Sequence, residues 1–369
     1  MKKFLSLLLV LIWAISLSAC GDLANPPINN ESISDTTDGE KPTTDNEATS
    51  DTTDDENPPI EPNPVSDFEY EINSIQTGIW IKKYVGSSEH VVIPSHIENL
   101  PVVSLRGVPD ENYPSSVDEG VFEGSNVKTV IIPETVLVIG FTCFHDCQSL
   151  TSVTFTANSA LAFVKGRAFQ NCTALEQIDF SSTKLQEIEL FAFNGCTKLK
   201  EITFSSTLEK IGEKAFYECP SLLEVDFPDS LIEVEGGAFA YCTSIEKVWV
   251  PARMNLIALE EAIFYGVPNL KTIEFKEGRE SIMGYGLFNT NVNIEMIIPA
   301  SVKKLSPLPF FFNPPSIVTI TFLGNAPEIV EDKDVSWLEN AIIYYDPETV
   351  GWETFAWKDK CEVKPIPQK

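Results

Sequence analysis

Histidine is scarce in this chain of 369 residues, and the few that occur do not form a catalytic motif. The three histidines are His90, His96 and His145, and none stands in a nucleophile or metal-binding pattern. Acidic pairs such as Glu260 and Glu261 are present, but carboxylates are so abundant that no pair is marked as a glycosidase site. The sequence therefore predicts no catalytic residues, and a protein that is not an enzyme.

Positive charge is also in short supply. Lys and Arg number 26 against 54 Asp and Glu, which gives a formal net charge of −28. Phosphate recognition needs clustered Lys and Arg, so nucleic acid is excluded as the expected partner. An acidic surface instead favours solubility and basic or cation-bridged partners.

The chain lacks the close-spaced ligand pairs of metal sites. No Cys-x2-Cys pair occurs, and Cys143-x3-Cys147 is poor evidence for a zinc site because Cys143 lies outside the repeated cysteine position. The acidic segment near the N-terminus lacks the Asp-x-Asp-x-Asp-Gly spacing of a calcium loop. We therefore expect neither a metal nor a cofactor.

No apolar run is long enough to span a bilayer. The run from Phe4 to Leu17 has about 14 residues, whereas a membrane-spanning helix needs about 20. Lys2-Lys3 precede this run and Leu17-Ser18-Ala19-Cys20 end it, which predicts a secretory signal peptide over residues 1–19. These last four residues resemble the bacterial lipobox, which implies cleavage before Cys20 and anchoring to the membrane through a lipid on its thiol.

After Cys20 the composition changes to Asp, Glu, Thr, Ser, Asn and Pro. Residues 21–66 contain twelve acidic residues against the single Lys41. Such a segment cannot bury enough apolar surface to offset its ordering entropy. Residues 20–66 are therefore expected to form a lipidated, disordered acidic tether.

One motif, Phe-x2-Cys-x2-(Leu or Ile)-x2-(Val or Ile)-x-(Phe or Val), occurs five times. It begins at Phe144, Phe169, Phe193, Phe216 and Phe239. A period of about 24 residues falls in the leucine-rich-repeat range, and such short units must stack on one another to bury their apolar positions. The alternation in residues 200–204 predicts a strand with Ile202 and Phe204 inward. The sequence thus predicts a β-rich solenoid over residues 122–322, with parallel strands, short loops or 3-10 turns, and terminal caps.

Five cysteines share one position of this motif, and so should form a column of small buried side chains. They are Cys147, Cys172, Cys196, Cys219 and Cys242. Equivalent side chains of stacked coils point the same way, which is poor geometry for disulfides. We expect buried free thiols, with Cys361 standing alone near the C-terminus.

Several further segments carry a family resemblance. They are Ile93-Pro94-Ser95, Leu100-Pro101-Val102, residues 211–219 and residues 342–347 with Gly351-Trp352. From about residue 67 to residue 369 the chain resembles the BspA-like leucine-rich-repeat surface proteins. Residues 67–121 resemble that family's N-terminal cap and lead-in, and residues 323–369 its closing cap. The resemblance implies adhesion, either to host matrix or plasma proteins such as fibronectin and fibrinogen, or to neighbouring bacteria.

If the solenoid binds a partner, the outward strand positions should line up on one face. Candidate ligand-binding residues at these positions are Asp179, Glu201, Glu224, Asp226, Trp249 and Glu274. Solenoids commonly bind through extended faces, and exposed aromatic side chains are favoured contacts. The alternative for Trp249 is that its ring merely covers a neighbouring side chain.

The function that these patterns favour is that of an exported lipoprotein, anchored to the bacterial envelope, whose solenoid binds macromolecules without catalysis. A protein-binding adhesin for a host extracellular protein or a bacterial surface macromolecule is the first hypothesis. A glycan-capturing module and a structural spacer without a specific ligand are the alternatives.

Overall fold

The computed structural model describes residues 61–105, 120–255, 262–282, 288–289, 293–306, 318–330 and 336–367. The predicted signal peptide, the lipidation site Cys20 and the tether up to residue 60 lie outside the described residues. The description below concerns the compact unit that begins at Pro58.

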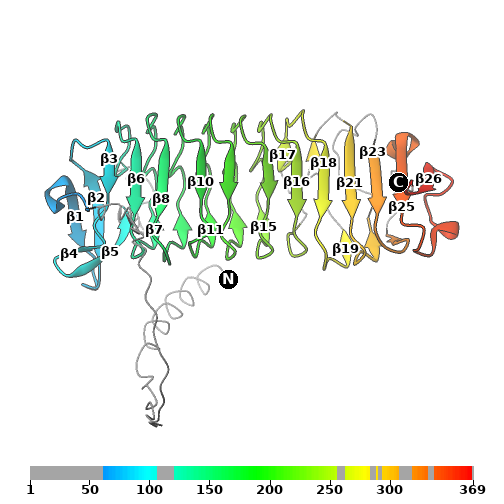
Figure 1. Ribbon diagram of the computed structural model, residues 1–369, viewed down its shortest axis with the longest axis horizontal. Coiled ribbons are helices and arrows are strands. Elements are labelled where there is room, and N and C mark those ends of the chain that lie inside the picture. The colour runs from blue at the N-terminus through cyan, green and yellow to red at the C-terminus, as the bar shows by residue number, and fades with distance from the viewer. Residues whose placement is uncertain are drawn as a thin grey trace, which may run out of the picture. The chain divides into compact units, whose positions relative to one another are not determined.

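This unit is a solenoid in which each coil contributes strands to parallel rows (Figure 1). The predicted parallel-strand solenoid is thus confirmed. The long-strand row contains β3 (His90–Val92), β6 (Thr129–Ile132), β8 (Ser152–Phe155), β10 (Gln177–Asp179), β12 (Glu201–Thr203), β14 (Glu224–Asp226), β16 (Lys247–Val250), β18 (Thr272–Phe275), β21 (Ile294–Ile298), β23 (Val318–Phe322), β25 (Ala341–Tyr345) and β26 (Glu362–Pro365).

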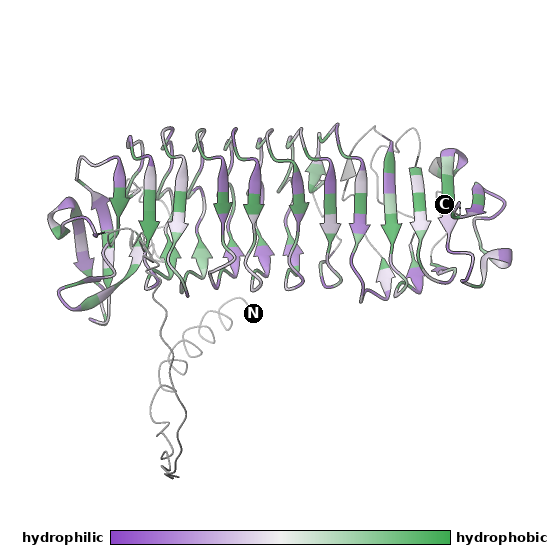
Figure 2. Ribbon diagram, in the orientation of Figure 1, coloured by the Kyte–Doolittle hydropathy of each residue, from purple (hydrophilic) through white to green (hydrophobic). Residues whose placement is uncertain are grey.

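The other strands after β5 are each two residues long and form further rows on the same coils. They are β7 (Val138–Ile139), β9 (Phe163–Val164), β11 (Glu187–Ile188), β13 (Lys210–Ile211), β15 (Glu233–Val234), β17 (Phe264–Tyr265), β19 (Ser281–Ile282), β20 (Phe288–Asn289), β22 (Lys304–Leu305) and β24 (Glu328–Ile329). Apolar and polar residues alternate along the strands (Figure 2), as a face that is buried on one side requires.

The N-terminal end departs from the parallel pattern. Here η1 (Val65–Asp67) leads into β1 (Phe68–Ile72), which pairs antiparallel with β2 (Ile79–Tyr84), while β4 (His96–Ile97) pairs antiparallel with β5 (Leu100–Leu105). Asn63, which lies within the segment predicted as tether, already contacts this end of the fold. Its backbone N–H donates to the Val92 carbonyl over 2.9 Å. This hydrogen bond joins Asn63 to strand β3.

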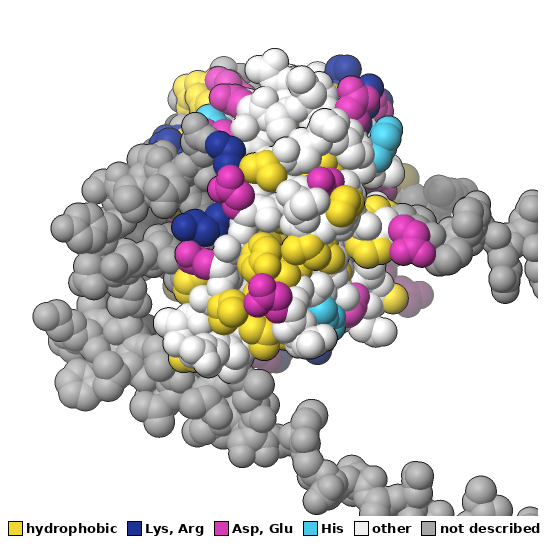
Figure 3. All heavy atoms as spheres, turned by 90° about the vertical axis from the view of Figure 1, so that its left-hand side faces the viewer, with side chains coloured by type: hydrophobic (Ala, Val, Ile, Leu, Met, Phe, Trp, Pro, Cys, Tyr) yellow, Lys and Arg dark blue, Asp and Glu magenta, His cyan; other side chains and the backbone are white. Residues whose placement is uncertain are grey.

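The exposed edge of β1 carries charge on a partly apolar face. Figure 3 looks onto this end and shows hydrophobic side chains near its centre, with acidic side chains around them. Glu69 is exposed on β1, and Ile72 is 43% exposed. Charged side chains on an edge strand disfavour pairing with another chain.

At the C-terminal end the long-strand row continues through residues that resemble a closing cap. Strand β25 pairs parallel with β23, and β26 pairs parallel with β25. The short 3-10 helices η2 (Ser336–Asn340) and η3 (Trp352–Thr354) lie in the same region. The Trp352 ring stacks on Tyr345 at a centroid distance of 4.8 Å. The last strand ends at Pro365, whose missing N–H suits an edge.

A continuous stack of phenylalanine rings forms the centre of the core. The first phenylalanines of successive coils lie 4.8–5.4 Å apart between ring centroids, with interplanar angles of 2–19°. The stack contains Phe122, Phe144, Phe169, Phe193, Phe216, Phe239 and Phe264. Each ring between the two ends of the stack is covered by a ring on both sides, so one coil cannot bury this core alone.

Beside the rings, the five cysteines form a column of buried thiols. Each Sγ donates to the carbonyl oxygen of the stacked phenylalanine one coil earlier, as Cys172 does to Phe144 over 3.1 Å. The five distances range from 2.8 to 3.2 Å. All five cysteines are free and buried, and their thiols add a second hydrogen bond to carbonyls such as that of Phe144, which already accepts from the Cys147 N–H over 3.1 Å.

The residue before each of these cysteines has a left-handed backbone. Its φ is 56° at Asp146, 61° at Asn171, 72° at Gly195, 57° at Glu218 and 60° at Tyr241. Gly, Asn and Asp accept this conformation readily, whereas Glu and Tyr are strained in it. The sharp turn before the thiol column thus imposes the same backbone geometry on very different side chains.

Candidate functional site

The strand register brings the candidate ligand-binding residues onto one face of the long-strand row. Glu201 stands beside Gln177, and Asp226 stands beside Trp249, which in turn stands beside Glu274. Asp179, Glu201, Glu224 and Asp226 are exposed, while Trp249 and Glu274 are half-buried. The face therefore presents carboxylates and one aromatic ring from five neighbouring coils.

This row of strands is interrupted at two places. Strands β3, β6 and β8 form one sheet, β10 and β12 form a two-stranded ribbon, and a third sheet begins at β14. The hydrogen bond from Leu223 N–H to the Lys200 carbonyl, at 3.3 Å, still connects the coils of β12 and β14 at the start of these strands. Beyond that point the two strands are not paired in the sheet, and a gap opens between them.

The gap between β12 and β14 holds a groove of about 920 Å³, here called the main groove. Its walls come from both sides of the gap and from the two following coils. It is lined by Lys200, Glu201, Ile202, Thr203, Phe204, Ser206, Leu223, Glu224, Asp226, Phe227, Pro228, Asp229, Trp249 and Lys276. Four of the six candidate residues thus meet in a single cavity.

The gap between β8 and β10 holds a second cavity of about 270 Å³, here called the small hollow. It is lined by Ser152, Val153, Thr154, Phe155, Gln177, Ile178, Asp179, Ser182, Glu201 and Thr203. Asp179 lies here, so five of the six candidates line one of the two cavities. Glu274 lines neither.

One core residue beside the second gap is less covered than its equivalents on the neighbouring strands. Ile202 is half-buried, whereas the equivalent Val225 is fully buried and Ile178 is 2% exposed. Leu223, on the far side of the same gap, is 52% exposed. The main groove therefore offers apolar surface beneath its acidic rim. Ile202 and Leu223 were not among the sequence candidates, because the repeat pattern assigns Ile202 to the core.

The acidic residues of the main groove differ in how they are neutralised. The Lys276 ammonium lies 2.7 Å from Asp226 and 3.8 Å from Asp229. Glu201 and Glu224 form no ion pair with any residue that the structure describes. These two exposed carboxylates remain available to a cationic group.

Trp249 is partly covered by a neighbour on its own strand. The Lys247 ammonium lies 4.1 Å from the centroid of the Trp249 ring and 2.9 Å from a Glu274 carboxylate oxygen. The ring of Trp249 therefore covers a neighbouring side chain, Lys247, and also lines the main groove. Glu274 serves as the ion-pair partner of Lys247.

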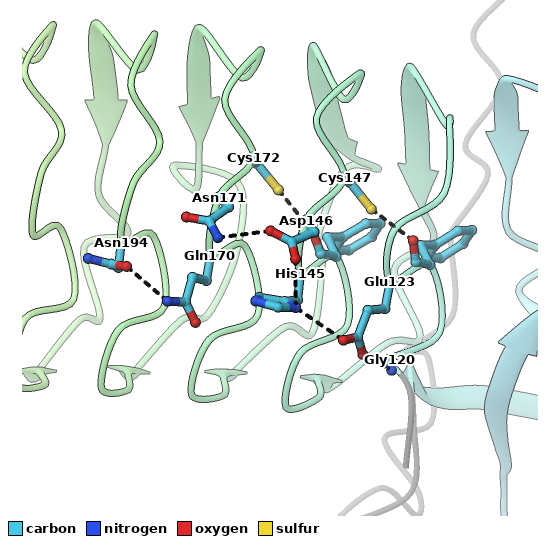
Figure 4. A network of polar contacts seen from close by, with 11 residues as sticks. Gly120, Glu123, His145, Asp146, Cys147, Gln170, Asn171, Cys172 and Asn194 are labelled. Carbon is cyan, nitrogen blue, oxygen red and sulfur yellow. Dashed lines mark hydrogen bonds and ion pairs between the residues drawn. The ribbon is translucent and has the colours of Figure 1, made fainter. Parts of the chain in front are cut away.

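A separate polar network lies on the turns that precede the thiol column (Figure 4). His145 Nδ1 lies 3.1 Å from a Glu123 carboxylate oxygen and 3.6 Å from Asp146. Asn171 donates to Asp146 over 2.8 Å, and Glu123 accepts from the Gly120 N–H over 2.6 Å. These contacts tie successive turns together. They place the histidine between two carboxylates but beside no nucleophile.

The thiols do not supply that nucleophile. Burial raises the pKa of the Cys147 thiol from its usual 9.0 to about 11, and that of Cys196 to about 12. Burial likewise raises the pKa of Cys361 to about 11. A thiol must ionise to act as a nucleophile or metal ligand, so these groups are unreactive near neutral pH.

Across the described residues, no group of three or more His, Cys, Asp or Glu side chains is arranged to hold a metal ion. The helices found in that part of the chain are too short to cross a membrane.

Comparison with known proteins identifies the repeat. The sequence profile of a family described as "BspA type Leucine rich repeat region" matches residues 115–246 and 233–332, with 6 copies, which is more than half of the chain. No curated protein matches the chain.

Among solved structures, the chain is similar to a leucine-rich-repeat protein of T. pallidum, with 26% sequence identity and a TM-score of 0.44. The match covers 62% of this chain and 88% of the T. pallidum protein. A leucine-rich-repeat protein from Bacteroides ovatus is 20% identical, with a TM-score of 0.43, and the match covers 81% of this chain and 75% of that protein. A leucine-rich cell surface protein from Faecalibacterium prausnitzii is 19% identical, with a TM-score of 0.30, and the match covers 66% of this chain and 90% of that protein.

Proposed function

Because the chain belongs to the BspA-type leucine-rich-repeat family, we propose that it is a surface protein whose solenoid binds other macromolecules without catalysis. It is exported by its signal peptide and held at the bacterial envelope by the lipid on Cys20. The acidic tether lets the solenoid reach partners beyond the membrane surface. Its ligand is another protein, and the solenoid acts as an adhesin.

One observation carries the choice of partner. The main groove combines the free carboxylates Glu201 and Glu224 with apolar surface at Leu223 and the ring of Trp249. Carboxylates bind Lys and Arg through charge-assisted hydrogen bonds, while the apolar floor accepts their aliphatic stems. The groove is therefore suited to a basic segment of an extracellular protein.

Glycan capture is the second candidate, and a different surface favours it. Tyr217, Tyr241 and Tyr265 follow one another on successive turns, with ring centroids 5.3 and 5.4 Å apart. Tyr241 is 38% exposed. A row of aromatic rings offers apolar faces together with hydroxyl groups, which suits a sugar better than a cationic peptide.

A binding screen separates these functions. The full-length protein in detergent micelles is applied to arrays of extracellular proteins and of glycans. Three variants are applied alongside it: the groove variant, which combines Glu201→Lys and Glu224→Lys, then Tyr241→Ala, and the control Glu280→Lys. Glu280 is an exposed acid outside the groove, paired with Lys303 at 2.8 Å. The proposal expects saturable protein binding that is lost only in the groove variant. Sugar binding lost in Tyr241→Ala would replace it with glycan capture, and silence on both arrays would leave a structural spacer.

A further inference from the structure

The residue immediately before each long strand from β3 to β18 is exposed, and most of these residues are charged. This position, here called the leading position, is occupied by Glu89, Lys128, Thr151, Glu176, Lys200, Leu223, Glu246 and Lys271. Leu223 is the apolar member of this row. A single exposed leucine is common on protein surfaces, so the surroundings of Leu223 decide whether it has a role.

Ion pairs between leading residues join neighbouring coils two at a time. The pairs are Glu89 with Lys128, Glu176 with Lys200, and Glu246 with Lys271, at N–O distances of 2.5, 2.9 and 2.7 Å. The uncharged leading residues, Thr151 and Leu223, each border one of the two gaps in the strand row. The row of ion pairs is therefore interrupted where the main groove opens.

The backbone is also looser at Leu223 than at the leading positions beside it. The Leu223 N–H donates to the Lys200 carbonyl over 3.3 Å. One coil earlier the Lys200 N–H donates to Glu176 over 2.8 Å, and one coil later the Leu223 carbonyl accepts from Glu246 over 2.9 Å. Leu223 thus stands where the coils separate, and its side chain gives the groove apolar surface in place of an ion pair.

This apolar surface extends over three successive coils. Ile202, Leu223 and Trp249 line the main groove and come from the coils of β12, β14 and β16. Ile202 and Trp249 are half-buried, and Leu223 is 52% exposed. The stem of a bound lysine or arginine can cover apolar surface, but one stem does not reach across three coils. A ligand with basic side chains alone would therefore leave part of this surface in water.

We propose that Leu223 is a specificity-determining contact of the main groove, and that the bound segment carries an apolar side chain beside its basic ones. This inference rests on the proposed function, and it narrows the ligand from a basic segment to an amphipathic one. The basic side chains bind the unpaired carboxylates Glu201 and Glu224, which supply charge complementarity. The apolar side chain packs on Leu223 and removes its exposed surface from water.

Two peptides that differ in one side chain test this inference. Fluorescein-labelled Lys-Lys-Leu-Lys-Lys and Lys-Lys-Ser-Lys-Lys are titrated into the full-length protein in detergent micelles, and anisotropy gives their affinities. Empty micelles serve as the blank, because a leucine also favours detergent. The leucine peptide should bind the wild type about fivefold more tightly, as expected when roughly half of a leucine side chain is buried.

Variants at exposed leucines assign the preference to one residue. Leu223→Thr introduces a side chain that Thr151 already carries at the leading position, so the fold should be retained. This variant should lose the preference for the leucine peptide and bind the serine peptide as the wild type does. Leu190→Thr, at a leucine that is 41% exposed and lines neither cavity, is the matched control and should keep the preference.

Three results would overturn the inference. They are equal binding of the two peptides to the wild type, no binding of either peptide, and a preference that survives Leu223→Thr.

The outcomes also separate this inference from the function on which it rests. If array proteins bind through Glu201 and Glu224 but the wild type does not prefer the leucine peptide, the adhesin function stands and the apolar contact is wrong. If neither peptides nor array proteins bind, both are wrong.

Discussion

Lys276 reaches back past the coil of β16 to close one side of the main groove, with its ammonium 2.7 Å from the Asp226 carboxylate. The same ammonium donates to the Phe227 carbonyl over 2.6 Å. The Lys276 ammonium thus forms an ion pair with a carboxylate, that of Asp226, that a basic ligand would otherwise bind. The groove therefore contains two acidic residues paired with Lys276, Asp226 and Asp229, beside the two unpaired ones, Glu201 and Glu224.

Replacing Lys276 with glutamine should strengthen binding of a basic peptide. The change removes the cation that competes for Asp226 and makes the groove more negative, so affinity should rise by about two- to threefold, in line with an exposed ion pair. Anisotropy titration with a fluorescein-labelled lysine-rich peptide measures this affinity. Lys303→Gln, at a lysine that does not line the groove, is the matched control and should leave the affinity unchanged. Weaker binding of Lys276→Gln would mean that Lys276 supports the site instead of competing for it.

Truncating one ring of the phenylalanine stack should destabilise the solenoid strongly. Phe193 is fully buried, with ring centroids 4.8 Å from Phe169 and 5.0 Å from Phe216. Phe193→Ala should lower the free energy of unfolding by about 3–5 kcal/mol, because the cavity uncovers both neighbouring rings. Urea denaturation gives this value. Leu190→Ala, at a side chain that is 41% exposed, should cost less than about 1 kcal/mol. Similar losses at the two positions would contradict a core built on the stack.

The thiol column should make stability fall in mild alkali. In the unfolded chain these thiols ionise near their usual pKa of 9.0, whereas burial raises the pKa to about 11 for Cys147 and about 12 for Cys196. Above pH 9 the unfolded state therefore holds fewer protons than the folded state, and stability decreases as pH rises towards the folded values.

Each buried thiol that stays protonated adds a slope of up to about 1.4 kcal/mol per pH unit in that window. Urea denaturation at pH 8, 9 and 10 measures the slope, and Cys196→Ala should reduce it by one thiol's share. Equal slopes in the two proteins would show that the thiol is not protected from ionisation.

A glycine at the left-handed position of Glu218 should stabilise the fold. Glu218 has φ of 57°, and glutamate is strained there, so Glu218→Gly should raise the free energy of unfolding by about 0.5–1 kcal/mol. Glu209 is also exposed but is not among the residues with positive φ, so Glu209→Gly should lower stability by a similar amount through backbone entropy. Thermal unfolding compares the two. A loss of stability in both variants would mean that the strain at Glu218 is negligible.

The repeat pattern could predict which side chains share a face, because strand alternation and a fixed period determine the register. Glu201 does stand beside Gln177, and Asp226 beside Trp249. The same pattern located the column of free thiols such as Cys172. Periodicity is sufficient here because each coil repeats the environment of the one before it.

The two gaps in the strand row could not be predicted in this way. They depend on how closely successive coils approach, and the residues at the second gap, Ile202 and Val225, obey the motif equally well. Lys276 was also missed, because its partner Asp226 lies two coils away and no local spacing connects them. The strain at Glu218 was hidden for a different reason, since glutamate gives no sequence signal of a left-handed turn.

The most direct test of the proposed site compares wild type with the double variant Glu201→Gln, Glu224→Gln. The affinity of each for the strongest protein ligand from the array is measured at low and at high salt. Surface plasmon resonance with the full-length protein gives the dissociation constants. We expect the variant to bind about tenfold more weakly at low salt, and the difference to shrink at high salt as exposed charges are screened. Equal affinity of the two proteins at low salt would contradict a binding site in the main groove.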